Sequence, residues 1–178
     1  MTEQQRYAVI RKFPGFELRR YEPCVIAEVQ VRGQFESAGS AGFRPLVSYI
    51  GGRNASGQSI AMTAPVLQEG ALTTDVHAVS FVMPAGSTID TMPAPSESNI
   101  TMRALDEEWV AAAKFSGRWT EAHVATELEA LRERIVAADL TAMGPPRFAR
   151  YDPPWTPWFM RRNEVLIPVA APTDGSLA

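Results

Sequence analysis

Side chains that could bind a metal ion or act as nucleophiles are few and widely spaced in this chain of 178 residues. It contains two histidines, His77 and His123, and one cysteine, Cys24, none at close spacing. Zinc and iron sites built from side chains need several such ligands close together, so the sequence argues against one. It also lacks a Gly-Lys-Ser/Thr phosphate loop and a Gly-x-Ser-x-Gly nucleophile elbow.

A segment near the C-terminus, DPPWTPWFMRR, combines large aromatic side chains with arginines. Trp155, Trp158 and Phe159 lie within five residues, beside prolines that stiffen the chain, and Arg161-Arg162 follows them. Rigid aromatic rings next to guanidinium groups suit a flat π-system that carries carboxylates. Two alternatives stay open: the rings close one end of the fold, or Trp155 and Trp158 dock on a partner protein.

The residues with lone pairs also have plain structural interpretations. His77 falls in an apolar strand at 76–83, on the same side as Val79 and Phe81, which fits a core histidine as well as a metal ligand. His123 falls in the first turn of a helix, away from its apolar stripe. Cys24 begins a strand and is interpreted as a buried, inert thiol.

Glu164 opens a closing strand, Glu-Val-Leu-Ile, and is the carboxylate with the clearest chemical potential. If it points into the fold unpaired, its pKa should rise because burial disfavours the charged form. It would then serve a ligand site or hydrolysis. The alternative is a structural carboxylate bonded to the backbone or to an arginine such as Arg162.

The stretch 43–67 predicts how a helix passes into a sheet. Phe43, Leu46, Val47 and Ile50 recur at helical spacing within a helix expected at 38–50, with Ser37 as its N-cap. Pro45 predicts a kink, or a helix that begins near it. Gly51-Gly52 ends the helix, and 60–67 returns as a strand with Pro65 at an edge or bulge.

The remaining elements repeat the same order. Strands are expected at 7–12, 16–21, 25–31, 76–83, 100–105, 109–115, 147–151 and 164–169, and a second helix at 121–138, capped by Thr120. Strands, helix and strands therefore occur twice, which predicts an α+β fold of two similar halves, 6–83 and 100–169. We expect a single domain at 6–169 with flexible tails at 1–5 and 170–178.

Composition adds limits rather than a function. A net charge of −3 gives no general attraction to nucleic acid, and no apolar run is long enough to span a membrane. The absence of a signal-like N-terminus and the single cysteine favour a cytoplasmic protein.

Several motifs, read in order, resemble the SOUL haem-binding protein family. They are YIGGRN at 49–54, IAMTAPV at 60–66, FELRRY at 16–21, VSFVMP at 79–84, FSG at 115–117, YDPP at 151–154 and RNEV at 162–165. The resemblance covers about residues 6–168. It implies a distorted antiparallel β-barrel flanked by two main helices, an architecture shared with effector-binding domains of bacterial regulators.

The resemblance also implies a ligand and a site. The ligand would be haem, a related tetrapyrrole or another flat apolar molecule, in a cleft between the first helix and the C-terminal loop. Carried onto this chain, the cleft residues are Phe43, Leu46, Val47, Ile50, Arg53, Trp158, Phe159, Met160 and Arg161. Arg53 and Arg161 are the propionate candidates.

No axial histidine is recognisable near the first helix, so the ligand is expected to be held mainly by apolar contact, with His77 as the only iron-ligand candidate carried forward. We favour a binding protein, acting as carrier, buffer or sensor, over an enzyme. The alternative is an effector-binding or hydrolytic domain that uses Glu164.

Overall fold

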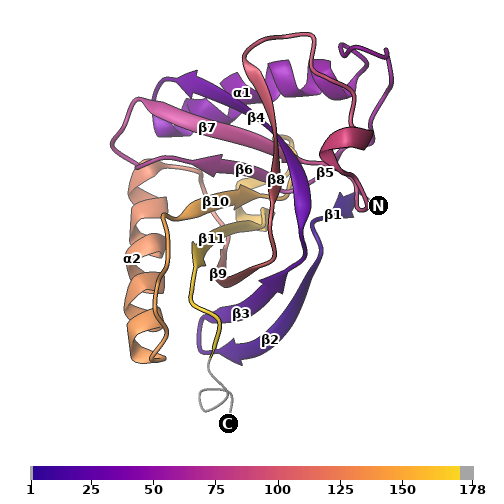
Figure 1. The fold of residues 1–178 in the computed structure, drawn as a ribbon. Coiled ribbons are helices and arrows are strands. Elements are labelled where there is room, and N and C mark those ends of the chain that lie inside the picture. Colours follow the sequence, from indigo (N-terminus) through magenta and orange to yellow (C-terminus); the bar gives the residue numbers. More distant parts are fainter. Residues whose placement is uncertain (1, 173–178) are drawn as a thin grey trace.

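Residues 2–172, which the computed structural model describes, form an α+β fold around one large antiparallel sheet (Figure 1). The sheet contains β2 (Tyr7–Phe13), β3 (Phe16–Tyr21), β4 (Cys24–Arg32), β6 (Val66–Glu69), β7 (Val76–Val82), β8 (Ile100–Leu105), β9 (Glu108–Phe115), β10 (Arg147–Arg150) and β11 (Asn163–Pro168). The helices are α1 (Phe35–Ile50) and α2 (Glu121–Ala137), with 3₁₀ turns η1 (Ile89–Thr91) and η2 (Trp158–Met160). A separate parallel pair joins β1 (Glu3–Gln4) to β5 (Thr63–Ala64).

The strand order β2-β3-β9-β11-β10-β6-β7-β4-β8 confirms the two similar halves. If β3, β4, α1, β6 and β7 are matched with β8, β9, α2, β10 and β11, the order from β3 to β8 is the same from either end. Within residues 2–172 the edge strands β2 and β8 do not pair with each other. The distorted barrel is therefore a strongly curved sheet that is not closed (Figure 1).

Both helices pack on the same face of this sheet. Phe148, in the cluster under α2, pairs with Gln68, and Gln68 pairs with Val79, in the cluster under α1, so these side chains project from one face. α1 lies on β4, β6 and β7, and α2 lies on β9 and β11. Buried residues under α1 include Leu46, Tyr49 and Val79, and those under α2 include Leu128, Leu131 and Val165. The opposite face, between the halves, is filled by a third cluster: Tyr21, Ile26, Leu67, Val82, Val110, Ala112, Ala149 and Leu166.

α2 follows its sequence pattern closely. The Thr120 side chain accepts a hydrogen bond from the backbone of His123 at 3.3 Å, which satisfies one free amide of the first turn. The predicted stripe, Val124, Leu128, Leu131 and Ile135, is buried. Capping chemistry and period agree here, so the helix bounds were predictable.

α1 corrects two expectations. Its N-cap is Gln34 rather than Ser37, whose hydroxyl donates to the Gln34 carbonyl at 3.0 Å. The helix begins at Phe35 and runs through Pro45. Tertiary packing outweighs local preference: Phe35, Ala38 and Leu46 are all buried, and burial of one face supplies most of a helix's stability.

The corner after α1 forms as predicted, and it depends on Asn54. Gly52 takes a φ of 110°, a left-handed conformation suited to glycine. The buried Asn54 amide donates to the carbonyls of Tyr49, at 3.0 Å, and Gln58, at 2.8 Å. The strand expected at 60–67 is interrupted at Pro65, which follows a cis peptide bond and separates β5 from β6.

The tails expected at the two ends of the chain can be compared with the structure only in part, because it describes residues 2–172. Glu3 and Gln4, within the expected tail at 1–5, pair with Thr63 and Ala64. Of the expected tail at 170–178, residues 173–178 lie outside the described residues. In the part of the chain that is described, neither helix combines the length and apolar character needed to cross a bilayer.

Candidate functional site

The four α1 residues expected in the site divide into two pairs. Leu46 and Ile50 are buried in the core under α1. Phe43 and Val47, one turn apart, are 40% and 37% exposed, so they form an apolar strip on the outer side of the helix. Only this second pair is available to a ligand without rearrangement of the core. Arg53, just past the helix, is exposed.

The C-terminal loop presents its aromatic residues outward. Trp158, Phe159 and Met160 form η2 and are 50%, 60% and 66% exposed. Arg161 donates hydrogen bonds from Nε to the Thr156 carbonyl, at 2.8 Å, and from Nη2 to the Pro154 carbonyl, at 2.6 Å. Arg161 therefore braces the loop that carries the exposed rings.

A series of contacts leads from η2 towards α1. The Gly117 amide donates to the Trp158 carbonyl at 3.0 Å, and the Arg118 guanidinium lies 5.7 Å from the Trp158 ring centre. The next residue, Trp119, has the Arg150 guanidinium 5.1 Å from its ring centre. Arg150 in turn lies against α1, because a Cβ built on Gly39 would be 2.9 Å from its Nη1.

The sheet connects the same two segments. Arg150 pairs with Val66, and Val66 pairs with Phe81, so their side chains share one face. The Phe81 ring meets the Phe43 ring edge-on at 5.3 Å. We call the exposed Phe43, Val47 and Trp158, the partly buried Arg150 and the buried Trp119 beneath it the α1–η2 face. The structure thus relates the predicted helix and loop residues through Trp119 and Arg150, which sequence reasoning missed.

Arg150 is the unusual residue of this face. Its side chain is partly buried, yet within residues 2–172 no group accepts a hydrogen bond from it or forms an ion pair with it. Burial, and secondly the positive charge of Arg161, lower the pKa of Arg150. A nearby anion would reverse both effects. The Trp119 indole N–H is also buried, and no acceptor for it lies among residues 2–172.

His77 lies deeper than the α1–η2 face. It is 1% exposed, and its ring centre lies 5.9 Å from that of Phe35, which stacks on Trp119 at 5.3 Å. Neither ring nitrogen has a hydrogen-bond partner among the residues described. To reach a ligand on the surface, His77 would have to displace the Phe35 packing. Its role as an iron ligand stays a prediction.

Glu164 points into the space between the halves, as expected, and is paired. It is fully buried; its Oε2 accepts from Arg19 Nη1 at 2.7 Å, and its Oε1 accepts from Arg162 Nη2 at 2.8 Å. The Tyr151 hydroxyl donates to the same carboxylate at 3.1 Å.

Burial alone would raise the pKa of Glu164, but the hydrogen bonds and charges of Arg19 and Arg162 lower it overall. Burial raises the pKa of neighbouring Tyr21 to about 12, against the opposing charge of Arg19. A carboxylate held ionised by two guanidiniums is a poor general acid, which favours the structural interpretation of Glu164.

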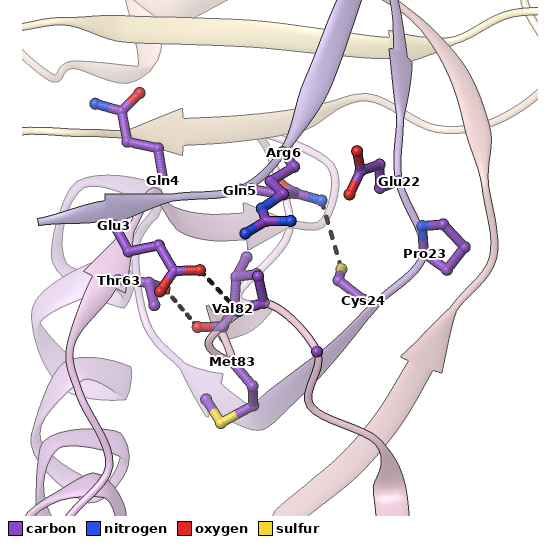
Figure 2. A pocket seen from close by; sticks show the side chains of 12 residues that line it. Glu3, Gln4, Gln5, Arg6, Glu22, Pro23, Cys24, Thr63, Val82 and Met83 are labelled. Carbon is purple, nitrogen blue, oxygen red and sulfur yellow. Dashed lines mark hydrogen bonds between the residues drawn. The ribbon is translucent and has the colours of Figure 1, made fainter.

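Two hollows lie elsewhere on the described part of the molecule. One of about 60 Å³ lies beside Cys24, where Gln5 Nε2 is 3.5 Å from the sulfur (Figure 2). This volume is far below the roughly 300–1,000 Å³ of ligand pockets. Cys24 is half-buried rather than fully buried, and burial raises the pKa of its thiol, which disfavours the reactive thiolate. A second, open hollow lies at the start of α1, near Glu36 and Asp75. Across residues 2–172, no three His, Cys, Asp or Glu side chains are grouped to hold a metal ion.

Comparison with known proteins gives one family and one fold. The family model described as SOUL heme-binding protein matches residues 2–168. Heme-binding protein 1 of Mus musculus is 28% identical over 161 residues, covering 86% of this chain and 83% of that protein. Heme-binding protein 2 of Homo sapiens is 32% identical over 111 residues, covering 58% and 54%.

Solved structures share the architecture at low identity. The EcmrR C-terminal domain superposes with a TM-score of 0.66 at 14% identity, over 92% of this chain and 98% of that domain. A hydrolase from Listeria innocua gives a TM-score of 0.59 at 9% identity, over 95% and 93%. Likeness at this level describes the fold alone.

Proposed function

Because the chain belongs to the SOUL haem-binding protein family, we propose that it binds haem or a related tetrapyrrole on the α1–η2 face. Phe43 and Val47 would contact one side of the macrocycle, and Trp158, Phe159 and Met160 the other. Haem would supply the iron and the strong visible absorption; the chain's own residues hold it and shield it from water. Carrier, buffer and sensor roles are all compatible with such binding.

The observation that carries this proposal is the outward placement of large apolar side chains from two distant segments. Phe43, Val47, Trp158, Phe159 and Met160 all stay at least one-third exposed. A group of exposed apolar side chains is typical of a binding site, whereas single exposed apolar residues are common on any protein surface. Flat aromatic rings suit a flat macrocycle, and the unpaired Arg150 suits an acidic one.

The same geometry predicts weak dependence on iron. His77, the iron-ligand candidate carried forward from the sequence, is 1% exposed in the core and so out of reach of a ligand on the surface. If apolar contact dominates, the iron contributes little to binding. The affinities for haemin and iron-free protoporphyrin should then agree within about threefold, a difference of about 0.7 kcal/mol in binding free energy.

The test is a titration of the protein with haemin and, in parallel, with iron-free protoporphyrin. Binding should shift the Soret band and quench tryptophan emission, because Trp158 and Trp119 lie on the proposed face. Unchanged spectra at micromolar protein would refute the proposal.

Two valine substitutions locate the site. Val47→Asp puts a charge on the proposed face, whereas Val136→Asp puts the same charge on α2, where the side chain is 77% exposed. A carboxylate facing an apolar macrocycle loses solvation. We expect Val47→Asp to weaken binding about tenfold or more and Val136→Asp to leave it unchanged. Equal affinities would place the ligand elsewhere.

A further inference from the structure

Arg150 carries a positive charge that no acidic side chain of residues 2–172 pairs with. It extends from the end of β10 on the helix-covered face of the sheet and is partly buried there. By contrast, buried Arg19 on β3 is bonded to Glu17, Tyr21 and Glu164. A guanidinium has five donors, and none of the Arg150 nitrogens is among the buried atoms without a partner, so its donors remain open to solvent and to a ligand.

The surroundings of Arg150 favour an anion rather than a missing protein partner. Its guanidinium carbon lies over the Trp119 ring, and within residues 2–172 the buried indole N–H of Trp119 has no acceptor. Arg161 adds a second positive charge nearby. Gly39 leaves the space that the Arg150 head group occupies against α1, since a Cβ there would lie 2.9 Å from Nη1.

Stacking on Trp119 does not by itself explain this arrangement. A cation over an aromatic face uses the flat side of the guanidinium and leaves the in-plane N–H groups free. Those in-plane donors are the ones that bind a carboxylate in a bidentate manner. Arg150, held beside Trp119 and against α1 with its donors unused among residues 2–172, is positioned to bind a carboxylate.

We propose that Arg150 is the carboxylate-binding residue of the α1–η2 face and selects flat ligands that carry an acidic side group. The proposal rests on the proposed function for the identity of the flat ligand, and it adds the chemical group that is recognised. In this proposal Arg150, rather than Arg53 or Arg161, makes the main contact with the ligand carboxylate. Arg161 already donates to two loop carbonyls.

The test compares protoporphyrin with its dimethyl ester, which has the same ring and no carboxylates. Wild-type protein should bind the acid more tightly than the ester. Arg150→Met should weaken binding of the acid about tenfold or more and leave binding of the ester unchanged, as expected for loss of a charge-assisted pair. Arg150→Lys, which keeps the charge but not the planar fork, should fall between the two.

Two controls separate this role from a structural one. Arg132→Met removes an exposed arginine of α2 paired with Glu129 and should leave both affinities unchanged. The ligand-free Arg150→Met protein should melt at the wild-type temperature or higher, because a partly buried charge without a partner among residues 2–172 is removed. A lower melting temperature together with equal losses for acid and ester would assign Arg150 to structure and overturn the proposal.

A second pair of ligands tests the role of Arg150 without a porphyrin. Pyrenebutyrate and the corresponding uncharged alcohol present a flat apolar group with and without a carboxylate. If no porphyrin binds, the proposed function fails. The Arg150 assignment then stands only if wild-type protein still prefers pyrenebutyrate over the alcohol and Arg150→Met loses that preference. Equal binding of the two pyrenes would refute it as well.

Discussion

At the scale of single residues, the positions that carry the family resemblance are largely structural. Tyr49 is 1% exposed and donates its hydroxyl to the Pro93 carbonyl at 2.8 Å, and Asn54 holds the turn that follows α1. The Thr63 hydroxyl donates to the Val82 carbonyl. These motif residues build the corner between helix and sheet. The residues of the α1–η2 face lie outside the tight turn.

Glu164 gives a prediction at this scale. Glu164→Gln leaves Arg19 and Arg162 buried or partly buried without their shared carboxylate. We expect a loss of about 3 kcal/mol in the free energy of unfolding at pH 7, the usual cost of removing one partner of a buried pair. Urea unfolding measures it. Glu133→Gln, on the exposed side of α2, should change stability by less than about 0.5 kcal/mol.

The pH dependence of this difference follows from the lowered pKa of Glu164. A carboxyl whose pKa is lower in the folded state contributes its full stability above the unfolded value, near 4.3. That contribution is lost as the pH falls through the folded pKa. Wild-type and Glu164→Gln proteins should therefore converge in stability in acid. A gap that stays constant from pH 7 to pH 3 would contradict the ion-pair explanation.

Neither Arg150 nor the partners of Glu164 could be predicted from local patterns. Arg150 belongs to a short strand, RFAR, in which alternation predicts only the face it occupies. That no acidic side chain of the described residues pairs with it depends on segments far away in the chain. Glu164 and Arg19 are 145 residues apart, so their pairing becomes visible only once β3 and β11 lie on either side of β9.

At the scale of secondary-structure elements, α1 shows what periodicity can and cannot decide. Spacing identified Phe43, Leu46, Val47 and Ile50 as one apolar stripe, and a helix there was correct. The stripe is wider than the contact that α1 makes with β4, β6 and β7, so two of its residues stay outside. The rotation of α1 about its axis determines which two residues stay outside, and the close packing of Gly42 against Val79 fixes this rotation.

Gly42 gives the prediction for this element. A Cβ on Gly42 would lie 2.4 Å from the Cβ of Val79, so Gly42→Ala forces α1 away from β7. Overpacking costs about 1–3 kcal/mol, which exceeds the roughly 1 kcal/mol that alanine gains in helix propensity. Urea unfolding should show net destabilisation. Ser40→Ala, on the exposed side of the same helix, should be neutral or slightly stabilising, and a stabilised Gly42→Ala would contradict this packing.

At the scale of the whole molecule, the two halves are interleaved rather than placed side by side. β3 belongs to the first half but pairs with β9 of the second, and β8 of the second half pairs with β4 of the first. The central contact, β6 with β10, joins the halves again. Each half therefore pairs with a strand that the other half provides, and both halves contribute residues to the cluster between them. The repeated element order predicted the halves, whereas the strand exchange required the structure.

This interleaving predicts that the protein unfolds as one cooperative unit, and the tryptophans offer a direct test. All four, Trp109, Trp119, Trp155 and Trp158, belong to the second half, so their emission reports that half alone. Far-ultraviolet circular dichroism reports both halves, because each contributes strands and one of the helices α1 and α2. If the halves stabilise each other through β3, β8 and the β6–β10 pair, the two signals should give the same midpoint in urea. If each half were stable alone, the midpoints would differ, and a fragment of residues 100–169 would keep its tryptophan transition.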